Sequence, residues 1–161
     1  MAPNGFLIND VWKDLSHLNG IEHYVYVNNK QVKLIFTFLN HCYTDEKGDF
    51  EMPFKHERRY WSEERYQQSL QLPTLLANEF TEKYAIAYRT RKGAEQYHYM
   101  EIHDYAIFFD ISIPAGEPDT IKIKVVSAYN VDAWGRSSLP KGKRFKLGWV
   151  LSRRIQGFKI L

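Results

Sequence analysis

The sequence predicts one α+β domain spanning residues 1–161, in which a mostly antiparallel sheet packs against one or two helices. Several short runs rich in β-branched and aromatic residues alternate apolar and polar side chains, as half-buried strands do. Most of these runs lie in the second half of the chain, while the helical patterns precede them. Helices followed by strands favour the α+β class over a parallel α/β sheet. The length is that of one ordinary domain.

The first part of the chain predicts a short helix and a hairpin. A helix is expected over residues 10–18, where Asp14-Leu15-Ser16 is compatible with one. Residues 24–28 and 31–39 are expected to pair as strands, because the Asn-Asn turn between them tolerates positive φ. One face of the second strand carries Val32, Leu34, Phe36 and Phe38.

Two helical pieces are expected next, after a polar loop at residues 45–54. Ser62 can cap a helix that runs to about residue 70, and two glutamates follow it at the positive end of the helix. Pro73 suits the first position of a second piece that reaches Phe80, because its missing N–H is not needed there.

The remaining elements are expected to be strands. Residues 105–111 are apolar on one face and begin the other with Ala106 and Phe108, so this strand is expected to be central and covered on both sides. Residues 121–125 have one apolar and one lysine-bearing face. Residues 91–93 are expected to form a turn, residues 134–142 a loop, and residues 155–160 a strand or a tail. The predicted strands are residues 84–90, 96–102, 104–113, 120–129 and 144–151.

Charge is unevenly distributed along the chain. Residues 133–161 hold eight Lys or Arg and no acid, while the rest holds 14 Lys or Arg and 19 Asp or Glu. This asymmetry predicts an anionic partner, and the interleaved rings of Phe145, Trp149 and Phe158 suit stacking on bases. An edge strand protected by lysines is the alternative interpretation. The predicted nucleic-acid contacts are Lys141, Lys143, Arg144, Lys146, Arg153 and Arg154.

Neither a cofactor nor a metal is expected from the motifs. The chain has no Cys/His spacing that suits structural zinc, no Walker A run and no G-x-G-x-x-G. Cys42 is the only cysteine, so no internal disulfide forms. No secretory signal or run of about 20 apolar residues is present. These features predict a cytoplasmic protein without membrane contact.

Candidate catalytic groups occur in three places. His41 ends the second strand and is placed to act as a general acid or base near neutral pH, whereas neighbouring Cys42 should face the other way and be buried. A basic run before the first capped helix suits a phosphate, although such a run is also typical of a solvated loop. Ser127 and Tyr129, near the end of the strand expected over residues 120–129, place their hydroxyls on one face. These hydroxyls either contribute to a site or only pack at the strand end. The candidates are His41, His56, Arg58, Arg59, Ser127 and Tyr129.

Three runs resemble a known group of proteins: FTFLNHCYTDEKG (36–48), ERRYWSEERYQQSLQLPTLL (57–76) and YAIFFDISIP with IKIKVVSAYN (105–130). Over about residues 30–160 they resemble small bacterial proteins of prophages and defence islands, some labelled stationary-phase growth adaptation proteins. RcaT-like toxins of retron toxin–antitoxin systems are counted among these proteins. The resemblance implies a toxin that a reverse transcriptase with its single-stranded DNA restrains.

The expected architecture is also similar to that of small toxin ribonucleases of the barnase, EndoU, colicin and RelE-like group, which place such residue types on one antiparallel sheet. We therefore expect an effector that cleaves RNA without a metal. His41 would take the proton of a 2′-hydroxyl, His56 or Tyr129 would assist the leaving oxygen, and Arg58 or Arg59 would hold the phosphate. The alternative is a non-catalytic module that binds nucleic acid or protein through its basic C-terminal segment.

Overall fold

The computed structural model describes residues 4–89, 96–132 and 135–160, and most of its regular structure is β-strand. Its helices are α1 (Glu63–Ser69), α2 (Leu72–Glu79) and α3 (Leu147–Ile155), with 3-10 turns at η1 (Ser16–Leu18), η2 (Phe80–Glu82) and η3 (Gly135–Ser138). Its strands are β1 (Gly5–Ile8), β2 (Val11–Asp14), β3 (Ile21–Val27), β4 (Lys30–His41), β5 (Thr44–Asp45), β6 (Tyr60–Trp61), β7 (Tyr84–Arg89), β8 (Gln96–Ile102), β9 (Tyr105–Ser112), β10 (Thr120–Asn130) and β11 (Arg144–Lys146).

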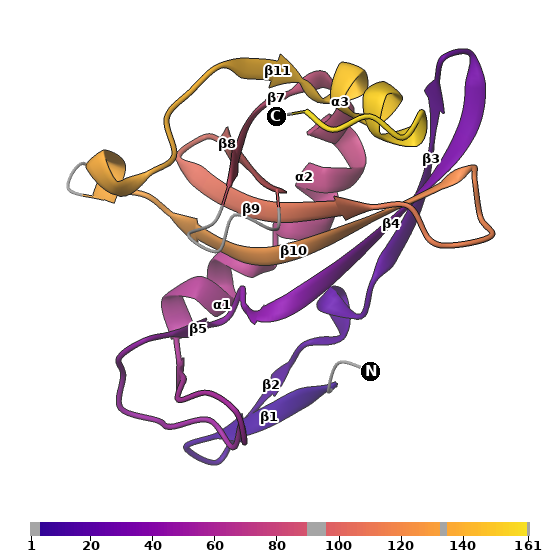
Figure 1. Cartoon of the computed structure of the whole chain (residues 1–161). Coiled ribbons are helices and arrows are strands. Elements are labelled where there is room, and N and C mark those ends of the chain that lie inside the picture. The colour runs from indigo at the N-terminus through magenta and orange to yellow at the C-terminus, as the bar shows by residue number, and fades with distance from the viewer. Residues whose placement is uncertain (1–3, 90–95, 133–134, 161) are drawn as a thin grey trace.

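A curled seven-stranded sheet forms the centre of the described chain, in the order β11-β7-β8-β9-β10-β4-β3 (Figure 1). Every neighbouring pair is antiparallel except β10 and β4, which are parallel. Two small hairpins, β1–β2 and β5–β6, lie outside this sheet. The predicted α+β class with a mostly antiparallel sheet is therefore confirmed.

The local signals at three element ends act as the sequence predicts. Asn28 and Asn29 have φ angles of 54° and 62°, so both residues of the β3–β4 turn are left-handed. The backbone N–H of Arg65 donates to the Ser62 hydroxyl over 3.2 Å at the start of α1. Pro73 lies in the first turn of α2, where its missing N–H leaves no helical hydrogen bond unmade.

One face of the sheet packs on the helices and forms the core. The ring of Phe80 lies between the rings of Phe36 on β4 and Phe109 on β9, at centroid distances of 5.2 and 5.3 Å. All three residues are at most 2% exposed. Leu72 and Leu76 of α2 and three apolar residues of α3 complete the core: Leu147, Val150 and Leu151.

Residues 144–151 were expected to be a strand, and this expectation is wrong beyond Lys146, because α3 begins at Leu147. The apolar residues of this segment fit both a strand and a helix. Burial of Leu147, Val150 and Leu151 at helical spacing decides for the helix. Gly157 ends it with a φ of 88°, in a motif in which Phe158 N–H donates to Arg153 O and Gly157 N–H donates to Arg154 O, each over 3.0 Å.

The α3 helix also links the two ends of the sheet. Leu147 N–H donates to the carbonyl of Lys83 over 2.9 Å, close to β7, and Ser152 Oγ bonds Asn28 Oδ1 over 2.8 Å at the tip of the β3–β4 hairpin. Figure 1 shows α3 beside this hairpin. One helix therefore contacts elements near both edges of the curled sheet.

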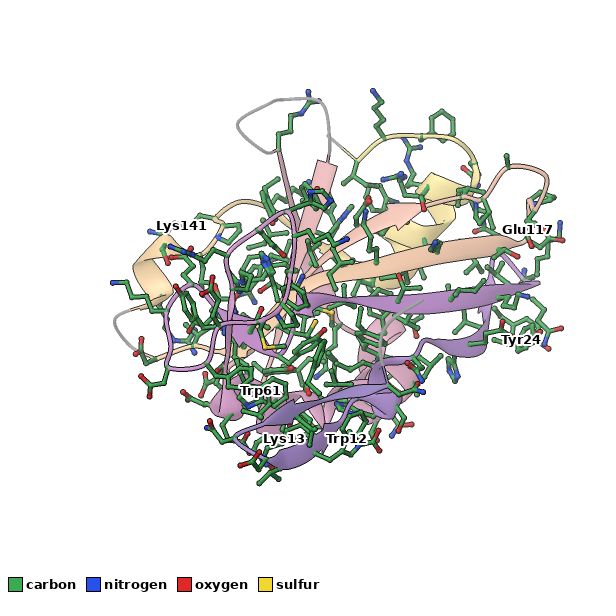
Figure 2. The ribbon with its side chains drawn as sticks, turned by 90° about the horizontal axis from the view of Figure 1, so that it is seen from below. Trp12, Lys13, Tyr24, Trp61, Glu117 and Lys141 are labelled. Carbon is green, nitrogen blue, oxygen red and sulfur yellow. The ribbon has the colours of Figure 1, made fainter. Side chains whose placement is uncertain are left out.

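The helix expected over residues 10–18 is also not found, since β2 and η1 occupy this range. The β1–β2 hairpin lies against the start of α1, where Glu63 accepts hydrogen bonds from Lys13 Nζ and Trp61 Nε1, both over 2.9 Å. Lys13 and Trp61 lie at the same end of the molecule in Figure 2.

The turn expected at residues 91–93 lies outside the described residues. Among the described helices, none has the length and apolar character needed to span a membrane.

The other face of the sheet, here called the outer face, carries a band of aromatic residues. These rings belong to strands β7 to β10, and the helical core packs on the opposite side. Four of the five are half-buried, while Tyr99 is 8% exposed. A register shift between Val125 and Ser127 turns Ser127 to this face and keeps Ala128 in the core. The band comprises Tyr88, Tyr97, Tyr99, Phe108 and Tyr129.

His98 is an unusual member of the core. It is fully buried, its ring stacks on Phe109 at 5.4 Å, and neither ring nitrogen has a hydrogen-bond partner among the described residues. Burial, followed by the nearby Arg154 cation, lowers the pKa of His98 from 6.5 to about 4. The imidazole is therefore neutral in the folded protein at pH 7.

This buried histidine predicts a loss of stability in acid. Below pH 6.5 the unfolded chain binds a proton at His98, whereas the folded protein does not bind this proton until about pH 4. The free energy of unfolding should therefore decrease as the pH is lowered through this window, by roughly 3 kcal/mol in total. Urea unfolding of the wild type and of His98→Leu between pH 7 and pH 4 would measure it. A variant that loses as much free energy of unfolding as the wild type would contradict the prediction.

Candidate functional site

His41 is the last residue of β4, and a carboxylate holds its imidazole. His41 Nε2 lies 3.1 Å from Glu57 Oε2, while Glu57 Oε1 accepts a 2.7 Å hydrogen bond from the Asn40 amide. The bonds from Asn40 and then His41 keep the pKa of Glu57 below its usual value. When Nε2–H donates to this carboxylate, the Nδ1 lone pair is free to accept a proton. An oriented histidine of this kind has the arrangement of a general base.

Two arginines fix the turn that follows His41. Arg59 donates from Nε to Thr44 Oγ1 over 3.1 Å and from Nη2 to Thr44 O over 2.9 Å. Arg65 of α1 donates from Nη1 to the carbonyls of His41 and Thr44 over 3.2 and 2.9 Å. Arg59 is 7% exposed, so its guanidinium is directed to the protein backbone and not to solvent. These bonds help to position His41, because they hold its carbonyl and the chain that follows it.

Ser127 and Tyr129 lie next to His41 on the outer face. Ser127 is the register partner of His41 in the parallel β4–β10 pair, and neighbouring strands lie about 4.8 Å apart. Tyr129 stacks on Phe108 at 5.8 Å, and the guanidinium of Arg65 lies 4.6 Å from its ring centroid. Burial raises the pKa of Tyr129, so its hydroxyl remains protonated and is a weak acid near pH 7.

Two hollows are lined by residues that neighbour His41. The first, of about 530 Å³, is bounded by Asn40 and by the loop from Pro53 to Glu57, which includes Lys55 and His56. The second, of about 300 Å³, lies over the aromatic band and includes Ser127 and Tyr129. His41 contacts Glu57 of the first hollow and is the register partner of Ser127 in the second.

The predicted catalytic residues do not all belong to this place. Ser127 lies opposite His41 on the neighbouring strand, with Tyr129 two residues further along, while His56 lines the hollow beside Asn40 and Glu57. Arg58 is directed elsewhere, because its exposed guanidinium pairs with Glu51 at 3.0 Å. Cys42 is fully buried, and burial raises the pKa of its thiol to about 12, so it is no nucleophile.

The basic C-terminal residues are spread over several surfaces. Lys141 and Arg144 border a hollow at the β7 end of the outer face, and Lys141 lies beside η3 in Figure 2. Lys143 Nζ lies 5.5 Å from the ring centroid of Phe145, and Lys146 is exposed. In α3, Arg153 lies over the rings of Trp149 and Phe158, at 5.7 and 4.2 Å. Arg154 Nη2 donates to the Ile111 carbonyl over 2.7 Å. The two helix arginines therefore make contacts within the fold.

Glu57, Asn40, Thr44 and Arg65 are not among the site residues expected from the sequence. Glu57 is 16 residues from His41 along the chain, and only the fold of the intervening loop brings them together. A weak signal was available: Glu57 is the sole acid in the basic run of residues 55–59.

The described residues offer no cluster of metal-ligating side chains. Within residues 4–89, 96–132 and 135–160, no three His, Cys, Asp or Glu side chains are grouped so that they could hold a metal ion. Glu57, the acid closest to His41, is occupied by Asn40 and His41. Proton transfer by side chains is the chemistry that this arrangement suits.

Comparison with known proteins places the chain by its sequence. No curated protein and no solved structure matches it. The family model described as the YjaZ family matches residues 5–155, which include the whole curled sheet, α3 and every residue of the candidate site. Because this match covers nearly the entire chain, the protein belongs to the YjaZ family.

Proposed function

We propose that this protein is an effector that cleaves single-stranded RNA, with His41 as the general base. The observation that supports this best is the 3.1 Å contact between His41 Nε2 and Glu57, next to a hollow that contains His56. A carboxylate that orients one imidazole, with a second imidazole in the hollow beside that carboxylate, offers a proton acceptor and a proton donor.

The reaction needs only two proton transfers. His41 Nδ1 takes the proton of a ribose 2′-hydroxyl, and the 2′-oxygen attacks the adjacent phosphorus. The bond from phosphorus to the 5′-oxygen breaks, and His56 gives its proton to that leaving oxygen. The products are a 2′,3′-cyclic phosphate and a 5′-hydroxyl, so neither an oxidant nor an additional nucleophile is required. Lys55, in the same hollow as His56, is a cation for the phosphate. Arg58 and Arg59 are directed to Glu51 and Thr44 instead.

We further propose that the cleavage acts as a toxin in a toxin–antitoxin or retron-type defence system. The target would then be cytoplasmic RNA, and a reverse transcriptase with its single-stranded DNA would restrain the protein. The basic residues at the β7 end of the outer face support this, because they lie apart from His41 and could contact an antitoxin's nucleic acid.

Incubation of the purified protein with labelled single-stranded RNA tests the cleavage proposal. Fragments that end in a 2′,3′-cyclic phosphate are expected, together with growth arrest when the protein is expressed without its partner. RNA that remains intact after prolonged incubation with a folded protein would overturn the nuclease assignment. Growth arrest that survives His41→Ala would indicate that the toxicity arises from binding.

The second candidate function is a binding module, and Lys141 and Arg144 beside the outer face favour it. If these cations contact phosphates of a single strand, the double variant Lys141→Gln/Arg144→Gln should reduce the salt dependence of binding. The slope of log K against log salt should fall by roughly 1.4 for two lost contacts.

Fluorescence anisotropy with a labelled oligonucleotide over a salt series measures this slope. The matched control is Lys30→Gln/Lys33→Gln, which removes the same charge from β4, near the far edge of the sheet. Equal slopes for both double variants would mean that the C-terminal cations attract nucleic acid only through net charge.

A further inference from the structure

The hollow over the aromatic band has the shape and lining of a site for a flat ring. It has a volume of about 300 Å³, and its lining is mainly apolar. Small-molecule sites commonly have this size and combine aromatic walls with a few polar groups. Its lining residues come from four neighbouring strands: Tyr88, Tyr97, Phe108, Val126, Ser127 and Tyr129.

The rings around this hollow form two stacked pairs that meet at a steep angle. Tyr88 and Tyr97 lie 6.1 Å apart with their planes 30° apart, and Phe108 and Tyr129 lie 5.8 Å apart with their planes 20° apart. Tyr88 meets Phe108 edge to face at 88°. A planar ligand can therefore lie on one pair while its edge contacts the other, which are the two favoured geometries of aromatic contact.

The surroundings of the rings distinguish this hollow from a piece of core. Each of the four rings remains half-buried, and the described helices pack their apolar residues on the other side of the sheet. Burial, as the main cause, raises the pKa of Tyr88 to about 12, so its hydroxyl stays a neutral hydrogen-bond donor. Apolar rings with neutral donors suit an uncharged heteroaromatic ring with polar edges.

The place of the hollow in the sheet connects it to the proposed reaction. Ser127 lines the hollow and is the register partner of His41 on the adjacent strand. Arg65 lies on the Tyr129 ring, and Lys124 on the same face of β10 pairs with Asp110 at 3.8 Å, so two cations lie near the hollow. A ring held here would have its attached sugar and phosphate within reach of these cations and of His41.

We propose that this hollow holds one unstacked nucleobase of a single-stranded RNA, next to the bond that His41 cleaves. This inference rests on the proposed ribonuclease function. Because the base must leave its neighbours to enter, an RNA duplex should be excluded. Stacking on aromatic side chains tolerates every base, so the site should select single strands more strongly than it selects a sequence.

Binding by Phe108→Leu tests the inference, because leucine keeps an apolar side chain and removes the π face. All binding proteins carry His41→Ala so that RNA stays intact. Affinity for a labelled single-stranded octamer should fall by about 5- to 150-fold, the range expected for one lost stacking contact. The control Tyr26→Leu removes a ring that is 78% exposed on β3, away from the hollow, and should bind as the parent does.

Two further ligands identify what the hollow accepts. A duplex of the same sequence should bind far more weakly than the single strand. A free nucleoside monophosphate that binds as tightly as the octamer, and is weakened by Phe108→Leu, would overturn the strand assignment in favour of a free nucleotide. Octamer binding that Phe108→Leu leaves unchanged would overturn the base site itself.

Crosslinking provides a readout that does not depend on the folding of a variant. An octamer with 4-thiouridine should crosslink to peptides containing Tyr97, Phe108 or Tyr129, and crosslinks confined to other peptides would contradict the inference. Failure of the parent function is separable from these outcomes. A protein with His41 intact that binds the octamer through Phe108 but never cleaves it would refute the ribonuclease proposal and leave the base site standing.

Discussion

His41→Ala is expected to lower the rate of RNA cleavage by about 10²–10⁴-fold, the usual contribution of a positioned general base. The reason is that no other described group both contacts Glu57 through an imidazole and lies opposite Ser127. Binding of RNA should change little, because the side chain is directed to a proton and not to a base or phosphate. Rates with a fluorescent dinucleotide substrate at saturating concentration measure the loss.

The matched control for this variant is His103→Asn. His103 is exposed in the β8–β9 turn, with a φ of 49°, and asparagine tolerates that conformation. It should cleave at the wild-type rate. Glu57→Gln tests the carboxylate in the same assay and should slow cleavage, because an amide at this position orients the imidazole less well. Cleavage by His41→Ala at more than about a tenth of the wild-type rate would remove His41 from the mechanism.

Phe80→Ala is expected to lower the free energy of unfolding by about 3–5 kcal/mol. Phe80 is the middle ring of the Phe36–Phe80–Phe109 series and is 2% exposed. Removing it leaves a cavity between the sheet and the helices and takes away an edge-to-face contact on each side. The midpoint of thermal unfolding should fall by roughly 6–20 °C for a domain of this size.

Tyr26→Thr is the control for this prediction, because Tyr26 is 78% exposed and threonine suits a strand. Its free energy of unfolding should lie within about 0.5 kcal/mol of the wild type. A loss below about 1 kcal/mol for Phe80→Ala would mean that the core collapses around the missing ring, and that the three rings do not hold the sheet against the helices.

Part of the candidate site could be predicted from residue type and from the alternation of side chains along each strand. His41 ends an alternating run, and Ser127 and Tyr129 are two residues apart, so both hydroxyls had to share a face. What joins the two strand ends is the parallel pairing of β4 with β10, and strand pairing has no signature within either strand. The partner of His41 depends in the same way on how the loop before α1 returns to β4.

The basic residues show the limit of reasoning from charge. Their number and sign were evident, whereas their directions were not. Arg59 and Arg154 donate to backbone carbonyls, and Arg153 lies over two rings. Lys141 and Arg144 instead face a hollow. A cationic side chain binds whichever acceptor the fold places beside it, so net charge predicts a class of partner but not the residues that contact it.

Alternation, turn residues and helix caps are local properties, and the sequence alone determined them: the α+β class, the β3–β4 hairpin at Asn28-Asn29, the Ser62 cap and the buried side of β9. The end of the chain was decided by tertiary contacts. Residues 147–151 fit a strand or a helix, and burial of Leu147, Val150 and Leu151 against the core selected the helix. The convergence of His41, Glu57 and Ser127 was likewise decided only in three dimensions. Contacts between distant segments depend on how the whole sheet curls, because each one forms only when both segments are already held in place.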